Sequence, residues 1–258
     1  MSVMKHALSW RREGSLAIAT TRVTMFELVH DLEQVDQAFE ELDGLEHDES
    51  IDALLFVPAG DDPPDSTLRG LVESSQLEAQ EARARGRLSL LRSFNILTRF
   101  AMRIVDFKKL VAVAWRDVVD PMYLGIGLTA GIRLAAEDVS FHVVNPELGM
   151  PPLGGIRYVL PQFLGIAKAR SLFLSGEPLP AARALELGLV DAILPTESFA
   201  EAAVQATARL VRAHLDLLGQ NRPIVCIDAH ALREHLREEM RAVERVNEGS
   251  RQSRFPAH

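Results

Sequence analysis

Short runs of almost entirely apolar residues are the feature of this sequence that most restricts its fold. The clearest runs are Ile51 to Val57 (IDALLFV) and Leu110 to Trp115 (LVAVAW). A strand that is covered on both faces has this composition, because neither face meets water. Stretches with helical periodicity separate the runs, so we expect parallel strands joined by right-handed crossovers. The sequence therefore predicts an α/β fold.

The other elements are predicted from the same two periodicities. Further strands are expected at 16–23, 139–144 and 189–194, and helices at 26–42, 125–134 and 180–188. A long helical stretch is expected from about 67 to 107, and its second half has an apolar stripe. The stripe consists of Leu91, Phe94, Leu97, Phe100, Ala101 and Ile104.

The domain organisation predicted from these patterns is simple, because the chain has no internal repeat and no low-complexity linker. We expect one α/β core at residues 1–197 and a C-terminal helical region at 198–258. The helical region is expected to consist of two or three segments, interrupted near 219–223 where Gly and Pro occur. We expect this region to take part in oligomerisation or to act as a lid.

Charge, hydropathy and cysteine content exclude several classes of function. A net charge of −8 offers no basic surface for nucleic acid. No apolar run approaches the about 18 residues of a membrane span, and the first ten residues lack the apolar segment of a signal peptide. Cys226 is the only cysteine, so no internal disulfide and no cysteine-based metal site are expected. We expect a cytoplasmic globular protein without a bound metal.

Three strings between Lys109 and Pro195 resemble the crotonase (enoyl-CoA hydratase/isomerase) superfamily. They are KLVAVAW, RLAAEDVSFHVVNPELGMPP and FLGIAKARSLFLSGEPLPAARALELGLVDAILP. The resemblance implies a crotonase-like spiral of ββα repeats, assembled as a homotrimer or a dimer of trimers, that binds acyl-CoA thioesters. Coenzyme A would be part of the substrate, and no separate cofactor is implied. The apolar stripe of the long helix could then line an acyl tunnel or be ordinary core.

The resemblance also implies an oxyanion hole, in which two backbone N–H groups stabilise a thioester enolate. One such donor lowers a barrier by about 3–4 kcal/mol. The family's glycine triplet falls on Pro121, Met122 and Tyr123. Proline has no N–H, so Met122 is the expected donor, although side chains replace the glycines that normally allow close approach to a ligand. The other donor is expected near Ser66, in PPDSTLRGL.

The two glutamates with which related hydratases activate water fall on Gly125 and Asn145. General acid–base catalysis needs a group that exchanges a proton near the working pH, and neither residue does so. A standard hydratase is therefore disfavoured, and a simple double-bond isomerase is weakened. Asn145 could still orient a water or bind a carbonyl, or it could be an ordinary residue of an Asn-Pro turn.

Three nearby side chains are candidates for a relocated acid or base. Glu147 lies two residues after Asn145 and could be a displaced base or a solvated carboxylate. Asp120 lies just before the altered triplet and could be catalytic or a turn residue. His142 could titrate near neutral pH or be packed within the sheet. The catalytic candidates are thus Asn145, Glu147 and Asp120.

The sequence supports two functions of different kinds. In the first, the protein is an enzyme that keeps an oxyanion hole at Met122 and near Ser66 and isomerises, decarboxylates or hydrolyses an acyl-CoA. In the second, it is a catalytically degenerate binding or partner subunit, which could form a hetero-oligomer with a related chain. A third possibility is a hydratase in which Glu147 and Asp120 replace the lost carboxylates.

Overall fold

The computed structural model describes residues 8–21, 31–59, 85–144, 152–218 and 227–249. Within these residues the main sheet has six strands in the order β1-β2-β3-β4-β6-β9. They are β1 (Leu8–Glu13), β2 (Leu16–Thr21), β3 (Ala53–Pro58), β4 (Leu110–Trp115), β6 (Ile132–Ala136) and β9 (Ala192–Leu194). The β1 strand pairs antiparallel with β2, and all the other pairs in the sheet are parallel. The predicted α/β fold is confirmed.

A second, smaller sheet lies beside the first and has the strand order β5-β7-β8. Its strands are β5 (Val118–Val119), β7 (Ser140–Phe141) and β8 (Leu179–Pro180). The β7 strand is shorter than the strand predicted at 139–144. It pairs in parallel with β5 and antiparallel with β8.

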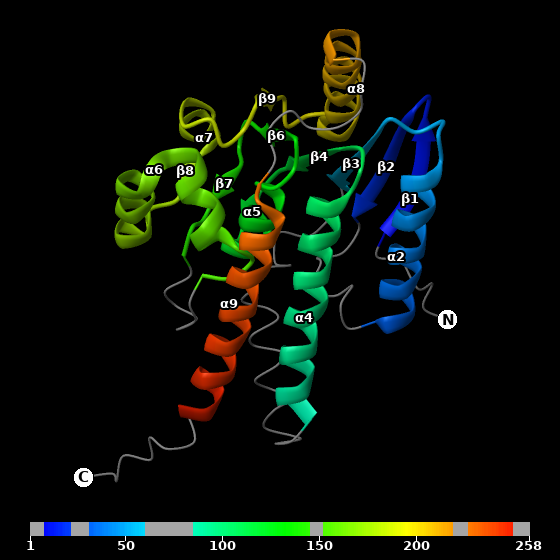
Figure 1. Cartoon of the computed structure of the whole chain (residues 1–258). Coiled ribbons are helices and arrows are strands. Elements are labelled where there is room, and N and C mark those ends of the chain that lie inside the picture. The colour runs from blue at the N-terminus through cyan, green and yellow to red at the C-terminus, as the bar shows by residue number, and fades with distance from the viewer. Residues whose placement is uncertain (1–7, 22–30, 60–84, 145–151, 219–226, 250–258) are drawn as a thin grey trace, which may run out of the picture.

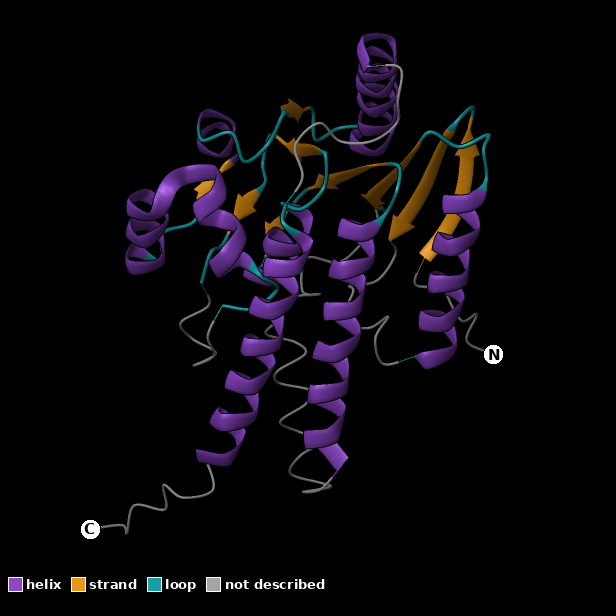
Figure 2. Cartoon of the chain, in the orientation of Figure 1, coloured by secondary structure: helices purple, strands orange, loops and turns teal. Residues whose placement is uncertain are grey.

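Helices cover both faces of the main sheet (Figures 1 and 2). They are α2 (Leu32–His47), α4 (Arg85–Asp106), α5 (Pro121–Gly127), α6 (Ile156–Ser175), α7 (Ala181–Glu186), α8 (Phe199–Leu218) and α9 (Ala229–Gly249). On β3, Leu54 and Phe56 join the core that contains α2, α4 and α5, whereas Leu55 joins the core that contains α8. Alternate residues of one strand thus enter different cores, which explains the continuous apolar runs.

The prediction of one helix over 125–134 is wrong, because α5 ends at Gly127 and β6 begins at Ile132. The α5 helix begins earlier, at Pro121, a position where the missing N–H of proline costs nothing. Residue 132 already belongs to β6, where it pairs with Ala112 of β4. The small residues of GIGLTAGIRL fit a closely packed helix and a buried strand equally well, so their composition did not separate the two elements.

The helix predicted at 26–42 begins later than predicted. Asp31 has an extended backbone, and its carboxylate accepts hydrogen bonds from the N–H groups of Glu33 and Gln34, so α2 starts at Leu32. Its predicted apolar positions at 26 and 29 lie outside the described residues. So does the first part of the long helix predicted from 67, since α4 is described only from Arg85.

The C-terminal helices lie on opposite sides of the main sheet. The α8 helix packs on the face that carries Leu55, whereas α9 returns to run beside α4 (Figure 1). Leu232 and Leu236 of α9 are buried, and Arg233 forms an ion pair with Asp106 of α4 at 3.0 Å. The last helix therefore reaches the part of the fold where α5 begins. In the described part of the chain no helix is long and apolar enough to cross a membrane.

Candidate active-site pocket

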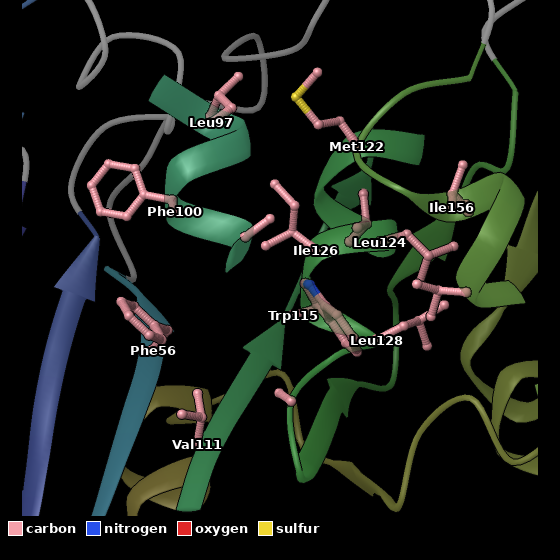
Figure 3. Close-up of a cluster of buried hydrophobic side chains, with 14 of the residues drawn as sticks. Phe56, Leu97, Phe100, Val111, Trp115, Met122, Leu124, Ile126, Leu128 and Ile156 are labelled. Atoms are coloured by element: carbon pink, nitrogen blue, oxygen red, sulfur yellow. The ribbon is translucent and has the colours of Figure 1, made fainter. Parts of the chain in front are cut away.

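A pocket lies between α4, α5, α9 and the loop that leads into α6. It encloses about 290 Å³ of space, part of which is open to solvent. Its lining residues are Leu97, Thr98, Ala101, Met122, Ile126, Leu153, Gly154, Leu236, Glu239 and Met240. Figure 3 shows Leu97 of α4 and Ile126 of α5 on its two sides, with the Met122 side chain extending toward α4. The predicted apolar stripe of the long helix therefore contributes to the pocket wall through Leu97 and Ala101.

Met122 occupies the first turn of α5 and is almost fully buried. The first intrahelical hydrogen bond of α5 is donated by Leu124 N–H to the Asp120 carbonyl at 2.9 Å. The N–H of Met122 precedes this bond and has no acceptor within its own helix. The residue expected to supply a backbone donor therefore lies in the pocket wall.

Gly125 stands where the resemblance places a lost glutamate, and the backbone around it leaves no room for a side chain. A β-carbon at this position would lie 2.5 Å from the Gly154 carbonyl oxygen and 2.8 Å from the Ile156 nitrogen. Both distances are shorter than real β-carbon contacts, and neither neighbour is the movable end of a side chain. The start of α6 therefore packs on α5 through the space that a glutamate would need.

The pocket contains a buried carboxylate that is not among the site residues predicted from the sequence. Glu239 of α9 is 4% exposed, and its Oε2 accepts a hydrogen bond from Gly155 N–H at 3.1 Å. Its Oε1 is hydrogen-bonded to Nε2 of His235, one helical turn earlier, also at 3.1 Å. Both carboxylate oxygens are thus held in place, one by the backbone before α6 and the other by an imidazole.

A signal for Glu239 exists in the sequence. Positions 232, 236, 239 and 240 form one face of a helix at spacings of three and four, and three of them are apolar. A glutamate on such a face either breaks the pattern or has a buried partner. The acid candidates predicted from the sequence lie between 120 and 147, and the sequence predicts the last helix as part of a C-terminal appendage.

His235 connects the buried carboxylate with a more exposed layer. Its side chain is 19% exposed, compared with 4% for that of Glu239. The Tyr158 ring of α6 lies 5.8 Å from the His235 ring, centroid to centroid. Burial, followed by the nearby negative charge of Asp228, raises the pKa of the Tyr158 hydroxyl above its ordinary value. The imidazole thus bonds to the buried carboxylate and also lies beside the phenol ring.

The structure places the predicted site residues in three groups. Met122 and Gly125 lie on α5 at the pocket, as described above. Asn145, Glu147 and Ser66 lie outside the described residues, and so does Cys226.

The third group is described but lies away from the pocket lining. Asp120 is buried, and its carbonyl begins α5. His142 is half-buried and donates its backbone N–H to Val119 O at 2.9 Å beside the small sheet. In the described ranges, no three His, Cys, Asp or Glu side chains are grouped so that they could hold a metal ion.

Comparison with known proteins identifies similar chains over most of this length. A family model described as enoyl-CoA hydratase/isomerase matches residues 102–247. A 1,2-epoxyphenylacetyl-CoA isomerase of Escherichia coli (strain K12) is 27% identical over 213 residues, which are 81% of this chain and 77% of that protein. The family match includes both Met122 and Glu239.

Solved structures agree with this match at the level of the fold. An enoyl-CoA hydratase from Bacillus halodurans superimposes with a TM-score of 0.69 and 17% identity, over 92% of this chain and 93% of the other. A monofunctional enoyl CoA isomerase from M. smegmatis superimposes with a TM-score of 0.58 and 18% identity, over 90% and 91%.

Proposed function

The chain belongs to the enoyl-CoA hydratase/isomerase family of the crotonase superfamily, and from this premise we propose that it is an enzyme of acyl-CoA thioesters whose reaction is not standard hydration. The fold predicted from the sequence resemblance is confirmed by this membership and by the structural similarities. The proposed reaction develops negative charge on the thioester oxygen, as an enolate in an isomerisation or a decarboxylation and as a tetrahedral intermediate in a hydrolysis.

The observation that carries this proposal is the contrast between Met122 and Gly125 on the same short helix. Met122 lines the pocket, where its N–H would stabilise a developing enolate oxygen. At Gly125 the backbone of the following loop occupies the place of a glutamate side chain. These two observations support a reaction that uses an oxyanion donor and lacks one of the two carboxylates of a hydratase.

The lining of the pocket favours an apolar acyl group. The space inside it has room for about one water molecule, so the acyl group must be short and the side chains of the wall must move to admit it. Apart from Thr98 and Glu239, the side chains of its wall are apolar. A short acyl chain would lie among Leu97, Ile126 and Leu236, with the thioester carbonyl at the first turn of α5.

A second candidate function is a degenerate binding or partner subunit. Met122 is only 3% exposed and brings a side chain to a position where the family has glycine. This side chain reduces the space for a thioester. The two candidates differ in one measurable property, because an enzyme that isomerises through an enolate exchanges a proton at the carbon next to the thioester, whereas a binding subunit does not.

We also propose that the protein assembles as a trimer or a dimer of trimers in the cytoplasm. Ile166 and Leu174 of α6 support an assembly, because they are 79% and 75% exposed. Exposed apolar side chains that gather on one element commonly mark a contact between proteins. Sedimentation of the purified chain tests the state of assembly, and a monomer at micromolar concentration would contradict it.

Binding of acyl-CoA tests the proposed function directly. A ligand that binds only the folded protein stabilises it by about 2.7 kcal/mol at one hundred times its Kd. We expect a rise in melting temperature with acetyl-, butyryl- and crotonyl-CoA that exceeds the rise with CoA alone. The free carboxylic acids are the matched controls. An unchanged melting temperature across the acyl-CoA panel would rule the proposal out.

A further inference from the structure

We infer that Glu239 of the last helix is the general base of this pocket and takes over the task for which the usual glutamate positions are lost. The inference deepens the proposed function and rests on it. During the reaction the C–H bond at carbon 2 of the acyl group breaks, and its proton forms an O–H bond with Glu239. The electron pair moves to the thioester carbonyl oxygen at Met122 N–H. The proton then returns to carbon 2, or to carbon 4 when the substrate has a 3,4 double bond.

The position of Glu239 is the first argument. Four polar or charged residues are buried among the described residues, namely Lys109, Asp120, Thr207 and Glu239. Only Glu239 among these four lines the pocket that Met122 also lines. A base and an oxyanion donor must face the same small space to act on adjacent atoms of a substrate. Met122 of α5 and Glu239 of α9 line the same pocket, as this requirement demands.

The hydrogen bonds of Glu239 are the second argument. A buried carboxylate is costly unless it is paired, and here Gly155 N–H and His235 each bind one oxygen. An ionised carboxylate has about four acceptor positions on its two oxygens. The two bonds therefore orient the group and leave acceptor positions for a substrate proton.

The anchoring of α9 is the third argument, because a base must be held in a fixed place. Leu232 and Leu236 are 1% and 2% exposed and lie two turns and one turn before Met240. A β-carbon at Gly155 would lie 2.7 Å from Cδ1 of Leu232, so α9 lies close against the start of α6. The ion pair of Arg233 with Asp106 fixes the other side of α9 on α4.

His235 acts as a positioning residue and as the connection to solvent. It holds Oε1 of Glu239, and its own side chain is more exposed than the carboxylate. A proton taken from the substrate can therefore leave through the imidazole without opening the pocket. The proton would pass from the substrate to Glu239, then to His235 and then to solvent.

A purely structural role for Glu239 is the competing explanation, since Gly155 is the N-cap of α6 and donates to this carboxylate. Glutamine keeps an acceptor for that N–H but cannot take up a proton. Aspartate keeps the carboxylate on a shorter side chain. The two substitutions therefore distinguish a structural role of Glu239, as a cap of α6, from a catalytic role as a base.

The test is exchange of the hydrogens at carbon 2 for deuterium in D2O, with butyryl-CoA and but-3-enoyl-CoA and detection by mass spectrometry. We expect exchange by the wild type and at least about a 100-fold slower rate for Glu239→Gln, because acid–base catalysis contributes about 10²–10⁴-fold. Melting temperature and acyl-CoA binding should be retained. Glu239→Asp should keep more exchange than Glu239→Gln. Glu238→Gln, the same change on the neighbouring exposed residue, should behave as the wild type.

Every other outcome of this experiment would contradict either the inference about Glu239 or the proposed function. Exchange by Glu239→Gln at the wild-type rate, or loss of exchange only in proportion to lost folding or binding, would make Glu239 a structural cap. A wild type that binds acyl-CoA without exchange would overturn the inference and favour the binding subunit. A wild type that neither binds nor exchanges would overturn the proposed function itself.

Discussion

Gly154 lies against the backbone of Met122, where the loop before α6 meets the first turn of α5. A β-carbon at position 154 would lie 2.6 Å from the Met122 carbonyl oxygen and 2.8 Å from its α-carbon. Gly154 also has a φ of +78°, which side-chain-bearing residues rarely adopt. The wall of the pocket therefore depends on two properties of one glycine, its lack of volume and its backbone conformation.

Replacing Gly154 with alanine should destabilise the protein by more than its backbone conformation alone explains. The left-handed conformation costs about 1–2 kcal/mol, and the overlap with Met122 adds about 1–3 kcal/mol. Gly188 has a similar φ of +71° with nothing within 4 Å, so Gly188→Ala incurs only the first cost. Urea unfolding measures both free energies. Equal losses in the two variants would show that Gly154 does not press on Met122.

Gly125→Ala and Gly44→Ala should have opposite effects on stability. Both glycines lie within helices, and an exposed helical Gly→Ala change normally stabilises by about 0.5–1 kcal/mol. Gly44 of α2 has open space around it, so this gain is expected there. At Gly125 the contact with the backbone before α6 should reverse the sign. Stabilisation by both changes in urea unfolding would show that α6 can move away from α5.

The pair of His235 and Glu239 should behave as one unit in the exchange reaction. A hydrogen bond to a charged group contributes about 1.5–3 kcal/mol, so His235→Ala should slow deuterium exchange by roughly 10- to 100-fold. His235→Gln keeps an N–H donor and should recover part of this loss. In the Glu239→Gln background, His235→Ala should have little further effect. Fully additive effects would indicate that the two side chains act independently.

The lowered pKa of Asp48 predicts that acid reduces the stability of the folded state, through a residue that lies away from the pocket. Hydrogen bonds from the Ser50 hydroxyl and N–H, and then the Arg12 guanidinium, lower this pKa from 3.8 to about 2. Because the folded state binds the proton more weakly, this stabilisation is complete above pH 3.8 and is lost as the pH falls to about 2.

Asp48→Asn should therefore lower stability near pH 6 and leave it almost unchanged near pH 2, as measured by urea unfolding across that range. The exposed Asp36 of α2 supplies the control Asp36→Asn. A loss of stability at Asp48→Asn that is the same at every pH would contradict the assigned cause.

The main features of the fold could be predicted because they depend on local composition. The run at 110–115 is covered on both faces by different cores, and its prediction as a strand agrees with β4 residue for residue. The segment 125–134 was assigned wrongly because small apolar residues suit a packed helix and a buried strand alike. The antiparallel β1 strand was missed, since its outer residues are largely exposed and lack a continuous apolar run.

The candidate site could be predicted only in part. Met122 was identified by its place in a family pattern, and the pattern also showed that Gly125 could not supply a carboxylate. Glu239 follows Met122 by more than a hundred positions, and nothing in the local sequence connects the two. They share a pocket because Leu232 and Leu236 bury the apolar face of α9 beside α4 and α5.

The sequence by itself determined the α/β architecture and the family, and its resemblance predicts that Gly125 and Asn145 stand in place of the hydratase pair of carboxylates. Periodicity and local motifs are properties of neighbouring residues, and these conclusions need nothing more. Only the tertiary structure decided that Gly125 is closed to a side chain and that the last helix brings a buried carboxylate to the pocket. Both facts arise from helices that pack over long sequence distances, where burial of apolar surface, rather than local pattern, selects which residues meet.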